Sequence, residues 1–271
     1  MASDNDLLDR IRNAPDLGAL DQLRVAALGK SGSVTALLKS LGSMDAEARA
    51  AEREELPLAA GSVAALHSGL VDLLDKYRLP SDFDRMPNEI EGALPFAEDK
   101  MHRVYSRDSA NRLREAFAAM LPVFERFRAG FTGKSSPVHF WWGSFDLAVT
   151  RFSGRSAPQH PGGVPGLPDR ITREAYSQEV SSAGFWAGGA IQAEPFFYSY
   201  AFPEPSGFRF WDIGAGGWNG DWQEFTLGYD EVRTSANPEV LLADFLRSTY
   251  DAAAELGQWD RARLERDPVA P

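Results

Sequence analysis

The fold class is decided by one stretch of sequence, Val138-His139-Phe140-Trp141-Trp142-Gly143-Ser144-Phe145-Asp146-Leu147-Ala148-Val149-Thr150-Arg151-Phe152. It is apolar at both alternating sets of positions, which is typical of strands covered on two sides, so it predicts one long or two short buried strands. Gly143-Ser144 predicts a bulge or bend within it. Segments 176–186 and 195–202 alternate and predict further strands. The last of these places four aromatic residues on one face: Phe196, Tyr198, Tyr200 and Phe202.

Helical patterns flank these strands. Apolar residues recur at helical spacing over 63–74, 108–131 and 238–256, and such spacing predicts amphipathic helices. Ser62 is expected to cap the first helix, and Pro122 to bend the second.

Other segments predict little regular structure. A proline limits 85–87 to a short edge strand, and the Pro/Gly-rich segment 157–168 excludes helix and strand. The Gly- and Trp-rich segment 206–222 is also expected to be irregular. The order of helices, then an aromatic-rich and mainly antiparallel sheet, then a C-terminal helix indicates the α+β class.

The bulk composition excludes several classes of protein. The chain has 271 residues, a formal net charge of −11 and no cysteine, which excludes disulfide scaffolds and Cys-ligated zinc. The acidic balance disfavours an electrostatic nucleic-acid binder. The N-terminus, Met1 to Asp6, is acidic and leads into no signal-peptide pattern, and no run is long enough for a membrane span. We therefore expect a cytoplasmic protein without a membrane partner.

Charged residues stand among these apolar strands, beside small side chains that leave room for a ligand. The candidate catalytic residues are His139, Asp146 and Glu179, with His139 as the proton-transfer group. The candidate ligand-binding residues are Arg151, Arg155, His160 and Tyr198. The two arginines would hold a small anionic ligand.

Two other interpretations of these residues stay open. The two histidines with Asp146 and Glu179 could form a metal site, but we assign no metal, and the pattern identifies no cofactor. The group could instead be a structural network with an Arg151–Glu179 or Arg155–Asp146 ion pair, because buried charges require partners.

Residues 16–49 resemble the N-terminal segment of the bacterial phenylalanyl-tRNA synthetase alpha subunit. The resemblance is carried by Leu20-Asp21-Gln22-Leu23-Arg24-Val25, Leu28-Gly29-Lys30-Ser31-Gly32-Ser33-Val34-Thr35-Ala36-Leu37-Leu38 and Leu41-Gly42. In that family the segment belongs to a helical arm that contacts tRNA, and the class II catalytic motifs have no counterpart downstream here. The resemblance implies an RNA- or protein-interaction module without ligase activity. Residues 1–55 carry seven basic and ten acidic residues, which disfavours tRNA as the partner.

Residues 56–265 resemble an uncharacterised bacterial family, domain of unknown function 5996. The longest strings that carry the resemblance are Met86-Pro87-Asn88-Glu89-Ile90, the stretch from Ser136 to Arg155, His160-Pro161-Gly162-Gly163, Arg173-Glu174-Ala175-Tyr176-Ser177, Glu179-Val180-Ser181-Ser182 and Phe197-Tyr198-Ser199-Tyr200. The resemblance brings no activity with it.

Members of that family begin with a further Trp-rich, strand-forming stretch, and here the synthetase-like helices stand in its place. The chain therefore resembles a gene fusion, with a helical segment at 1–55 and an α+β domain at 56–271. A missing strand region would leave an unpaired sheet edge, and such an edge can pair with a second copy of the chain to form a homo-oligomer. Three functions stay open: a small-molecule or enzymatic site in the sheet, an interaction module in the N-terminal helices, and a fusion product with impaired function.

Overall fold

The computed structural model describes Asn13, Ala19, Gln22, Leu56 and residues 58–189 and 192–266. The chain divides into two compact units, residues 1–57 and 58–271, and the sheet and its helices belong to the second unit. The helices expected within 1–55 lie outside the described residues, apart from the isolated positions named above.

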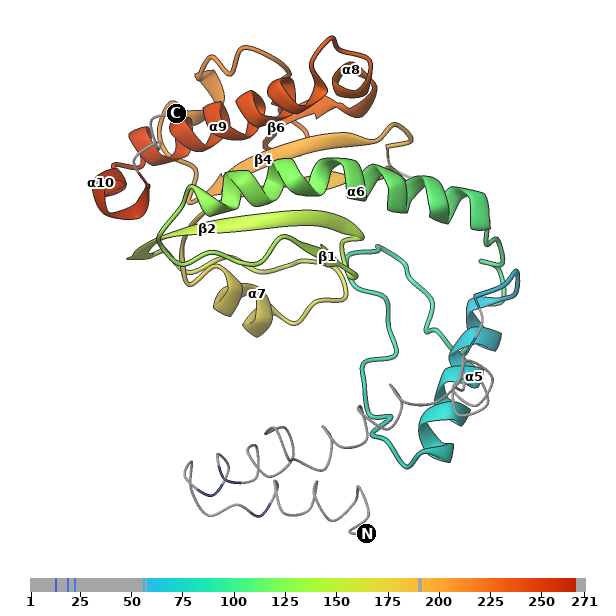
Figure 1. Ribbon diagram of the computed structural model, residues 1–271. Coiled ribbons are helices and arrows are strands. Elements are labelled where there is room, and N and C mark those ends of the chain that lie inside the picture. Colours follow the sequence, from blue (N-terminus) through green and yellow to red (C-terminus); the bar gives the residue numbers. More distant parts are fainter. Residues whose placement is uncertain are drawn as a thin grey trace. The chain divides into compact units, whose positions relative to one another are not determined.

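A single antiparallel sheet organises the second unit (Figure 1), with strand order β1-β2-β3-β4-β6-β5 among the described residues. Its strands are β1 (His139–Trp141), β2 (Asp146–Ser156), β3 (Gln178–Trp186), β4 (Phe196–Phe202), β5 (Gly217–Asn219) and β6 (Glu224–Gly228). The deciding stretch forms two strands, and Gly143-Ser144 belongs to the turn between them rather than to a bulge. The α+β class is confirmed.

Helices α6 (Arg107–Ala129) and α9 (Pro238–Leu256) lie on one side of this sheet and α7 (Asp169–Ala175) on the other (Figure 1). The unit also contains α5 (Val63–Lys76), α8 (Tyr229–Arg233), α10 (Arg261–Leu264) and a 3-10 turn η1 (Phe208–Phe210). The expected cap of α5 is confirmed, because the Ser62 side chain accepts a hydrogen bond from the Ala65 amide at 3.1 Å. Within the described residues, no helix combines the length and apolar character needed to span a membrane.

The edge strand expected at 85–87 is wrong, because this segment is irregular backbone. Pro87 has no amide proton to give to a strand ladder. Local side-chain bonds hold the segment instead: the Met86 amide donates to Asp84 Oδ1, and Arg85 donates to the Ser81 carbonyl. The neighbouring loop around Glu89 contributes to the site on the sheet.

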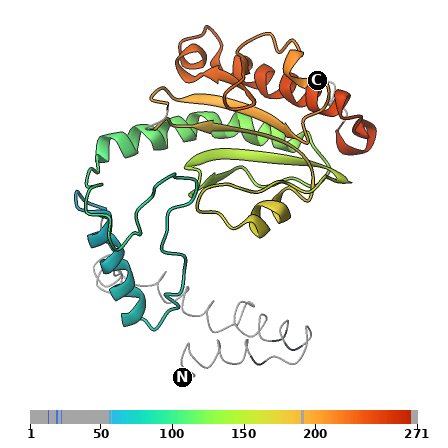
Figure 2. The same cartoon turned by 180° about the vertical axis from the view of Figure 1, so that it is seen from behind.

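The main core lies between one face of the sheet and the helices α6 and α9, which cross that face in both views (Figures 1 and 2). We call this the helix face. Its buried members include Val149, Phe185, Phe197, Phe225 and Leu227 from the strands and Phe124, Phe245 and Leu246 from the helices. Burying such side chains stabilises the fold by about 1.5–3 kcal/mol each.

The opposite side of the sheet, which we call the second face, is also buried over its centre. Strand alternation puts these residues there: Asp146, Ala148, Thr150, Ser182, Gly184, Trp186, Phe196, Tyr198, Tyr200, Glu224 and Thr226. The short helix α7 lies on this side (Figure 1). Aromatic residues of the second face form a separate core cluster around Ala148, Phe196 and Tyr198. Burial on both faces is the property that the deciding stretch predicted.

Candidate functional site

Asp146 begins β2 and points into the second face, where it is only 6% exposed. Tyr198 donates its hydroxyl proton to Asp146 Oδ2, whereas Oδ1 is buried without a hydrogen-bond partner. Burial raises the pKa of Asp146 to about 6, the Tyr198 hydrogen bond opposes this rise, and the negative charge of Glu89 adds to it. Asp146 is therefore a buried carboxyl group that titrates near neutral pH and has one oxygen free to accept a bond.

The ring of Tyr198 reaches Asp146 because β3 carries a glycine beneath it. Tyr198 of β4 pairs in register with Gly184 of β3. A Cβ atom at Gly184 would lie 2.5 Å from the ring carbon Cζ and the hydroxyl oxygen of Tyr198. Real Cβ atoms essentially never approach so closely, so the missing side chain at 184 makes the space for this phenol.

Glu224 begins β6 and belongs to the same face. It lies two residues before Thr226, the register partner of Tyr198. Burial, followed by the charge of Asp146, raises the pKa of Glu224 to about 8. At pH 7 Asp146 is about nine-tenths ionised and Glu224 about nine-tenths protonated, because each pKa lies about one unit from the pH. Together the two carboxyl groups therefore hold roughly one proton.

Tyrosine and hydroxyl side chains extend this centre across the face. The hydroxyl oxygens of Tyr176 and Tyr200 are 2.7 Å apart, and those of Thr150 and Ser182 are 2.9 Å apart. Burial raises the pKa of Tyr200 well above its ordinary value, so this phenol stays protonated and can donate. We call Asp146, Glu224, Tyr198, Tyr200 and Tyr176 the acid–tyrosine cluster.

A loop brings a third carboxylate toward the cluster. The Glu89 amide donates to the Pro165 carbonyl at 2.7 Å, and Ser144 donates to Glu89 Oε1 at 3.1 Å. Glu89 thereby ties the loop 85–92 to the β1–β2 turn and to the Pro/Gly-rich segment 157–168, which is irregular as expected. Burial raises the pKa values of Asp146 and Tyr176, and the charge of Glu89 adds to this rise.

Aromatic rings lie beside the cluster on the same face. The ring centroids of Phe196 and Trp222 are 4.8 Å apart, and those of Trp186 and Trp222 are 5.5 Å apart. The rings of Tyr198 and Tyr200 are stacked at 6.2 Å. The face therefore offers carboxyl and hydroxyl groups next to flat apolar surfaces.

Of the residues predicted for a site, Asp146 and Tyr198 come together, and Arg151 does not join them. Arg151 points into the helix face, where its guanidinium carbon lies 3.4 Å from the ring centroid of Phe127 and 4.2 Å from that of Tyr250. Its Nη2 donates to the Phe127 carbonyl, and burial lowers its pKa to about 10. Since Arg151 is five residues from Asp146 along one strand, alternation separates the two.

Arg155 and Glu179 pair with each other at the end of the helix face. Arg155 Nε and Nη2 lie 2.9 and 2.6 Å from Glu179 Oε2, and the guanidinium also donates to the carbonyls of Gly257 and Gln258. The structure thus forms neither the Arg151–Glu179 nor the Arg155–Asp146 pair. The register of β2 against β3 shifts between Phe152 and Ser156, which brings Arg155 to Glu179. A guanidinium just beyond the C-terminal end of a helix such as α9 is a favourable structural contact.

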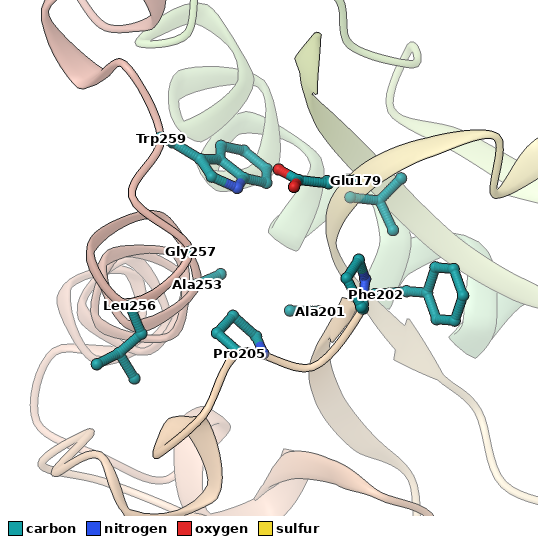
Figure 3. Close-up of a pocket in the computed structure, with 10 residues that line it drawn as sticks. Glu179, Ala201, Phe202, Pro205, Ala253, Leu256, Gly257 and Trp259 are labelled. Atoms are coloured by element: carbon teal, nitrogen blue, oxygen red, sulfur yellow. The ribbon is translucent and has the colours of Figure 1, made fainter. Parts of the chain in front are cut away.

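A cavity of about 130 Å³ lies beside this ion pair (Figure 3). Glu179 and Trp259 line one side of it, and Pro205 and Leu256 the other, while the ring of Phe202 points away. Its wall is mostly apolar, and its one carboxylate is already bound by Arg155. The cavity is therefore a weaker candidate than the acid–tyrosine cluster.

Neither candidate histidine is a hydrogen-bond partner of Asp146, whose Oδ2 accepts from Tyr198 and whose Oδ1 has no partner. His139 nevertheless belongs to the second face, because it pairs in register with Ala148. His139 is exposed on the edge strand β1, with its ring centroid 5.0 Å from that of Trp141. His160 Nδ1 accepts the Gly162 amide at 3.0 Å, and its ring stacks on Tyr176 at 4.7 Å. Among residues 58–189 and 192–266, no group of three or more His, Asp or Glu side chains could hold a metal. The seven predicted residues thus do not share one pocket.

Sequence reasoning missed Glu224, Tyr200, Tyr176 and Glu89. Glu224 follows a segment expected to be irregular, and the signal that could have found it is the alternation of Glu-Phe-Thr-Leu in 224–227. The alternation of β4 predicts that Tyr200 shares a face with Tyr198, but it indicates no role for Tyr200. Glu89 lies in a loop, and its approach depends on tertiary contacts alone.

Comparison with known proteins gives two findings. A model described as "Family of unknown function (DUF5996)" matches residues 40–266, and one described as "Aminoacyl tRNA synthetase class II, N-terminal domain" matches residues 15–52. Both resemblances identified from the sequence are confirmed. No solved structure matches the chain.

Alpha subunits of phenylalanine–tRNA ligase match the N-terminal region of the chain. The alpha subunit of phenylalanine–tRNA ligase from Rhodospirillum rubrum is 51% identical over 59 residues, covering 22% of this chain and 16% of the relative. That of Methylobacterium nodulans is 44% identical over 68 residues, covering 25% and 18%. That of Caulobacter vibrioides is 54% identical over 44 residues, covering 16% and 12%. The chain thus spans less than a fifth of the length of these three relatives.

Proposed function

Because this chain belongs to the family of unknown function DUF5996, whose description names no activity, we propose its function from geometry: it binds a small molecule at the acid–tyrosine cluster. Asp146 and Glu224 provide the acid–base groups of that site. The observation that carries the proposal is the Oδ1 atom of Asp146, which is buried and has no hydrogen-bond partner.

A buried acceptor without a partner costs about 1–3 kcal/mol. Of the six buried side-chain polar atoms without a partner in the described part of the chain, Asp146 Oδ1 is the one on a carboxyl group, and perturbed carboxyl groups gather at functional sites. A ligand that donates a hydrogen bond to Oδ1 would remove this cost. The neighbouring rings of Trp186, Phe196 and Trp222 supply the apolar contact area that small-molecule sites use.

The pair of carboxyl groups can also act on such a molecule. At neutral pH Asp146 is mostly ionised and Glu224 mostly protonated, with pKa values of about 6 and about 8. Environments that push two pKa values apart assign one group as base and the other as acid. Asp146 is then the base and Glu224 the acid, which replaces His139 as the proton-transfer candidate.

A fragment screen tests this proposal. A library of soluble small molecules is added to the full chain at pH 7, and the midpoint of thermal unfolding is measured. We expect compounds that raise the midpoint of the wild type but not that of Asp146→Asn. Glu179→Gln is the matched control, since its carboxylate lies on the helix face, and it should respond as the wild type does. A library in which every active compound shifts all three proteins equally would contradict the proposal.

A second candidate function rests on the synthetase-like segment. We propose that residues 15–52 bind tRNA or a protein without ligase activity, because they match a synthetase N-terminal domain and the alpha subunits named above. Filter binding with bulk tRNA at low and moderate salt tests the RNA form of this proposal. Salt-sensitive binding at micromolar protein would support it, and no retention at low salt would contradict it.

The domain organisation is a further proposal, with a helical segment at 1–55 followed by an α+β domain at 56–271. Limited proteolysis of the full chain should cut near the junction and leave a resistant fragment that unfolds cooperatively. Loss of cooperative unfolding in that fragment would show that the N-terminal segment is structurally required. It would also contradict a simple gene fusion.

A further inference from the structure

The second face points to a particular class of ligand: we propose that the small molecule bound at the acid–tyrosine cluster carries a protonated amine. This inference rests on the proposed function and specifies its ligand. It differs from the anionic ligand that the two arginines suggested, because both of those arginines lie on the helix face.

The charges that face the cluster favour a cation. Strands β2 and β6 contribute Asp146 and Glu224, and the loop 85–92 contributes Glu89, whose charge acts on Asp146. From the side of α7, Tyr176 and the ring of His160 face Tyr200 and Phe202. Helix α7 carries two basic residues, Arg170 and Arg173, and Arg173 is bound to Asp169 and to the carbonyls of His160 and Pro161. An anion brought to Asp146 would therefore meet acidic groups, whereas a cation would be attracted.

The unpaired oxygen of Asp146 selects for a hydrogen-bond donor. Oδ1 is an acceptor on a residue that is 94% buried, since its exposed fraction is 6%. An ammonium group carries three N–H donors and no acceptor, so it can bond to Oδ1 and still has donors for other acceptors of the cluster. A hydrogen bond between charged groups is roughly twice as strong as one between neutral groups. A neutral alcohol would satisfy the oxygen but not the charge.

The aromatic rings beside the cluster suit the rest of such a molecule. The rings of Trp186, Phe196 and Trp222 contact one another at centroid distances of 4.8 to 5.7 Å, and the stacked rings of Tyr198 and Tyr200 adjoin them. Cations bind to ring faces within about 6 Å of the centroid, most favourably for Trp. The same rings can bury an apolar substituent of the amine.

Binding of an ammonium group should displace a proton. The two carboxyl groups together hold roughly one proton at pH 7, and a cation placed between them takes over its electrostatic role. The bound amine stays protonated, Glu224 loses its proton, and that proton passes to the buffer. A cationic ligand therefore has a signature that a neutral ligand of the same shape lacks.

Isothermal titration calorimetry of the full chain at pH 7 measures this signature. Benzylamine is the cationic probe, and benzyl alcohol and benzoate are its neutral and anionic counterparts. Each is titrated in phosphate and in HEPES, whose ionisation enthalpies differ, so that the number of released protons is obtained. We expect benzylamine to bind at least tenfold more tightly than benzyl alcohol, with release of close to one proton. Benzoate should give no binding heat.

Three variants separate the outcomes. Asp146→Asn should weaken benzylamine at least tenfold, Glu224→Gln should abolish proton release, and Glu179→Gln should behave as the wild type, provided that each variant unfolds cooperatively. Equal binding of benzylamine to wild type and Asp146→Asn would overturn the inference. If benzyl alcohol or benzoate binds more tightly than benzylamine and that binding depends on Asp146, the amine class is wrong but the proposed site still stands. A fragment screen without any Asp146-dependent compound would overturn both.

Discussion

Replacing Glu224 with Gln should stabilise the fold at neutral pH and leave its stability at pH 4 nearly unchanged. In the folded chain, burial and the charge of Asp146 raise the pKa of Glu224 from 4.5 to about 8. The folded state therefore binds one more proton than the unfolded state between these two values. Stability falls as pH rises wherever the folded state holds the extra proton. Gln carries no titrating proton, so it removes this loss.

The size of the effect follows from the pKa difference. Each pH unit within the window from 4.5 to 8 costs the wild type about 1.4 kcal/mol of unfolding free energy relative to the variant. At pH 7 the difference is about 3 kcal/mol, an upper value because the Gln amide also needs hydrogen-bond partners. For a domain of this size, 3 kcal/mol corresponds to a rise of about 6–12 °C in the unfolding midpoint.

Urea unfolding at pH values from 4 to 9 measures this difference directly. The wild type and Glu224→Gln should have equal unfolding free energies near pH 4 and diverge as pH rises, with the variant becoming the more stable. The matched control is Glu98→Gln, because Glu98 is an exposed glutamate of the same unit. If the unfolding free energies of wild type and variant differ by the same amount at every pH, the raised pKa of Glu224 is wrong. It is also wrong if the variant loses stability relative to the wild type between pH 4 and pH 8.

Three further substitutions probe the contacts around the site and the ion pair. Tyr198→Phe removes the hydrogen bond that lowers the pKa of Asp146, so NMR should show this pKa rising further above 6. The unfolding free energy should fall by about 1–3 kcal/mol. An unchanged pKa would contradict the hydrogen bond between Tyr198 and Asp146. Gly184→Ala forces the Tyr198 ring aside, and urea unfolding should show a loss of about 1–3 kcal/mol, whereas a neutral effect would contradict the packing. Arg155→Gln breaks the contacts to Glu179 and to the backbone at the end of α9. Because the Arg155 side chain is 47% exposed, the unfolding free energy should fall by only about 1 kcal/mol. Hydrogen exchange at the α9 C-terminus should become faster, and unchanged exchange would contradict the role of Arg155 in holding that end.

Much of the sheet was predictable because alternation is a local property. The stretch 138–152 is apolar at both sets of positions and is buried on both faces. The aromatic residues of β4 lie on one face as expected. The C-terminal helix has the expected bounds, 238–256, since its apolar spacing and N-terminal proline are both local signals.

The site was less predictable because its members meet through strand order and loop contacts. Asp146 and Arg151 are five residues apart, and that odd spacing already places them on opposite faces, so the charge pattern alone was misleading. The Arg155–Glu179 pair depends on a register shift after Phe152, which no single-strand pattern shows. Glu224 joins Asp146 only because β6 lies beside β4. Since β5 stands between β4 and β6 along the chain, chain order does not reveal this pairing.

The proposed site depends on Asp146 and Glu224 together holding about one proton at neutral pH, mostly on Glu224. The most direct test is the pH titration of side-chain carboxyl carbon shifts by NMR, with Asp146→Asn and Glu224→Gln used to assign the two signals. Two carboxyl groups titrating near pH 6 and near pH 8, with the higher pKa falling in Asp146→Asn, are the predicted result. Titration of both groups below about pH 5, close to the ordinary carboxyl range, would contradict the account.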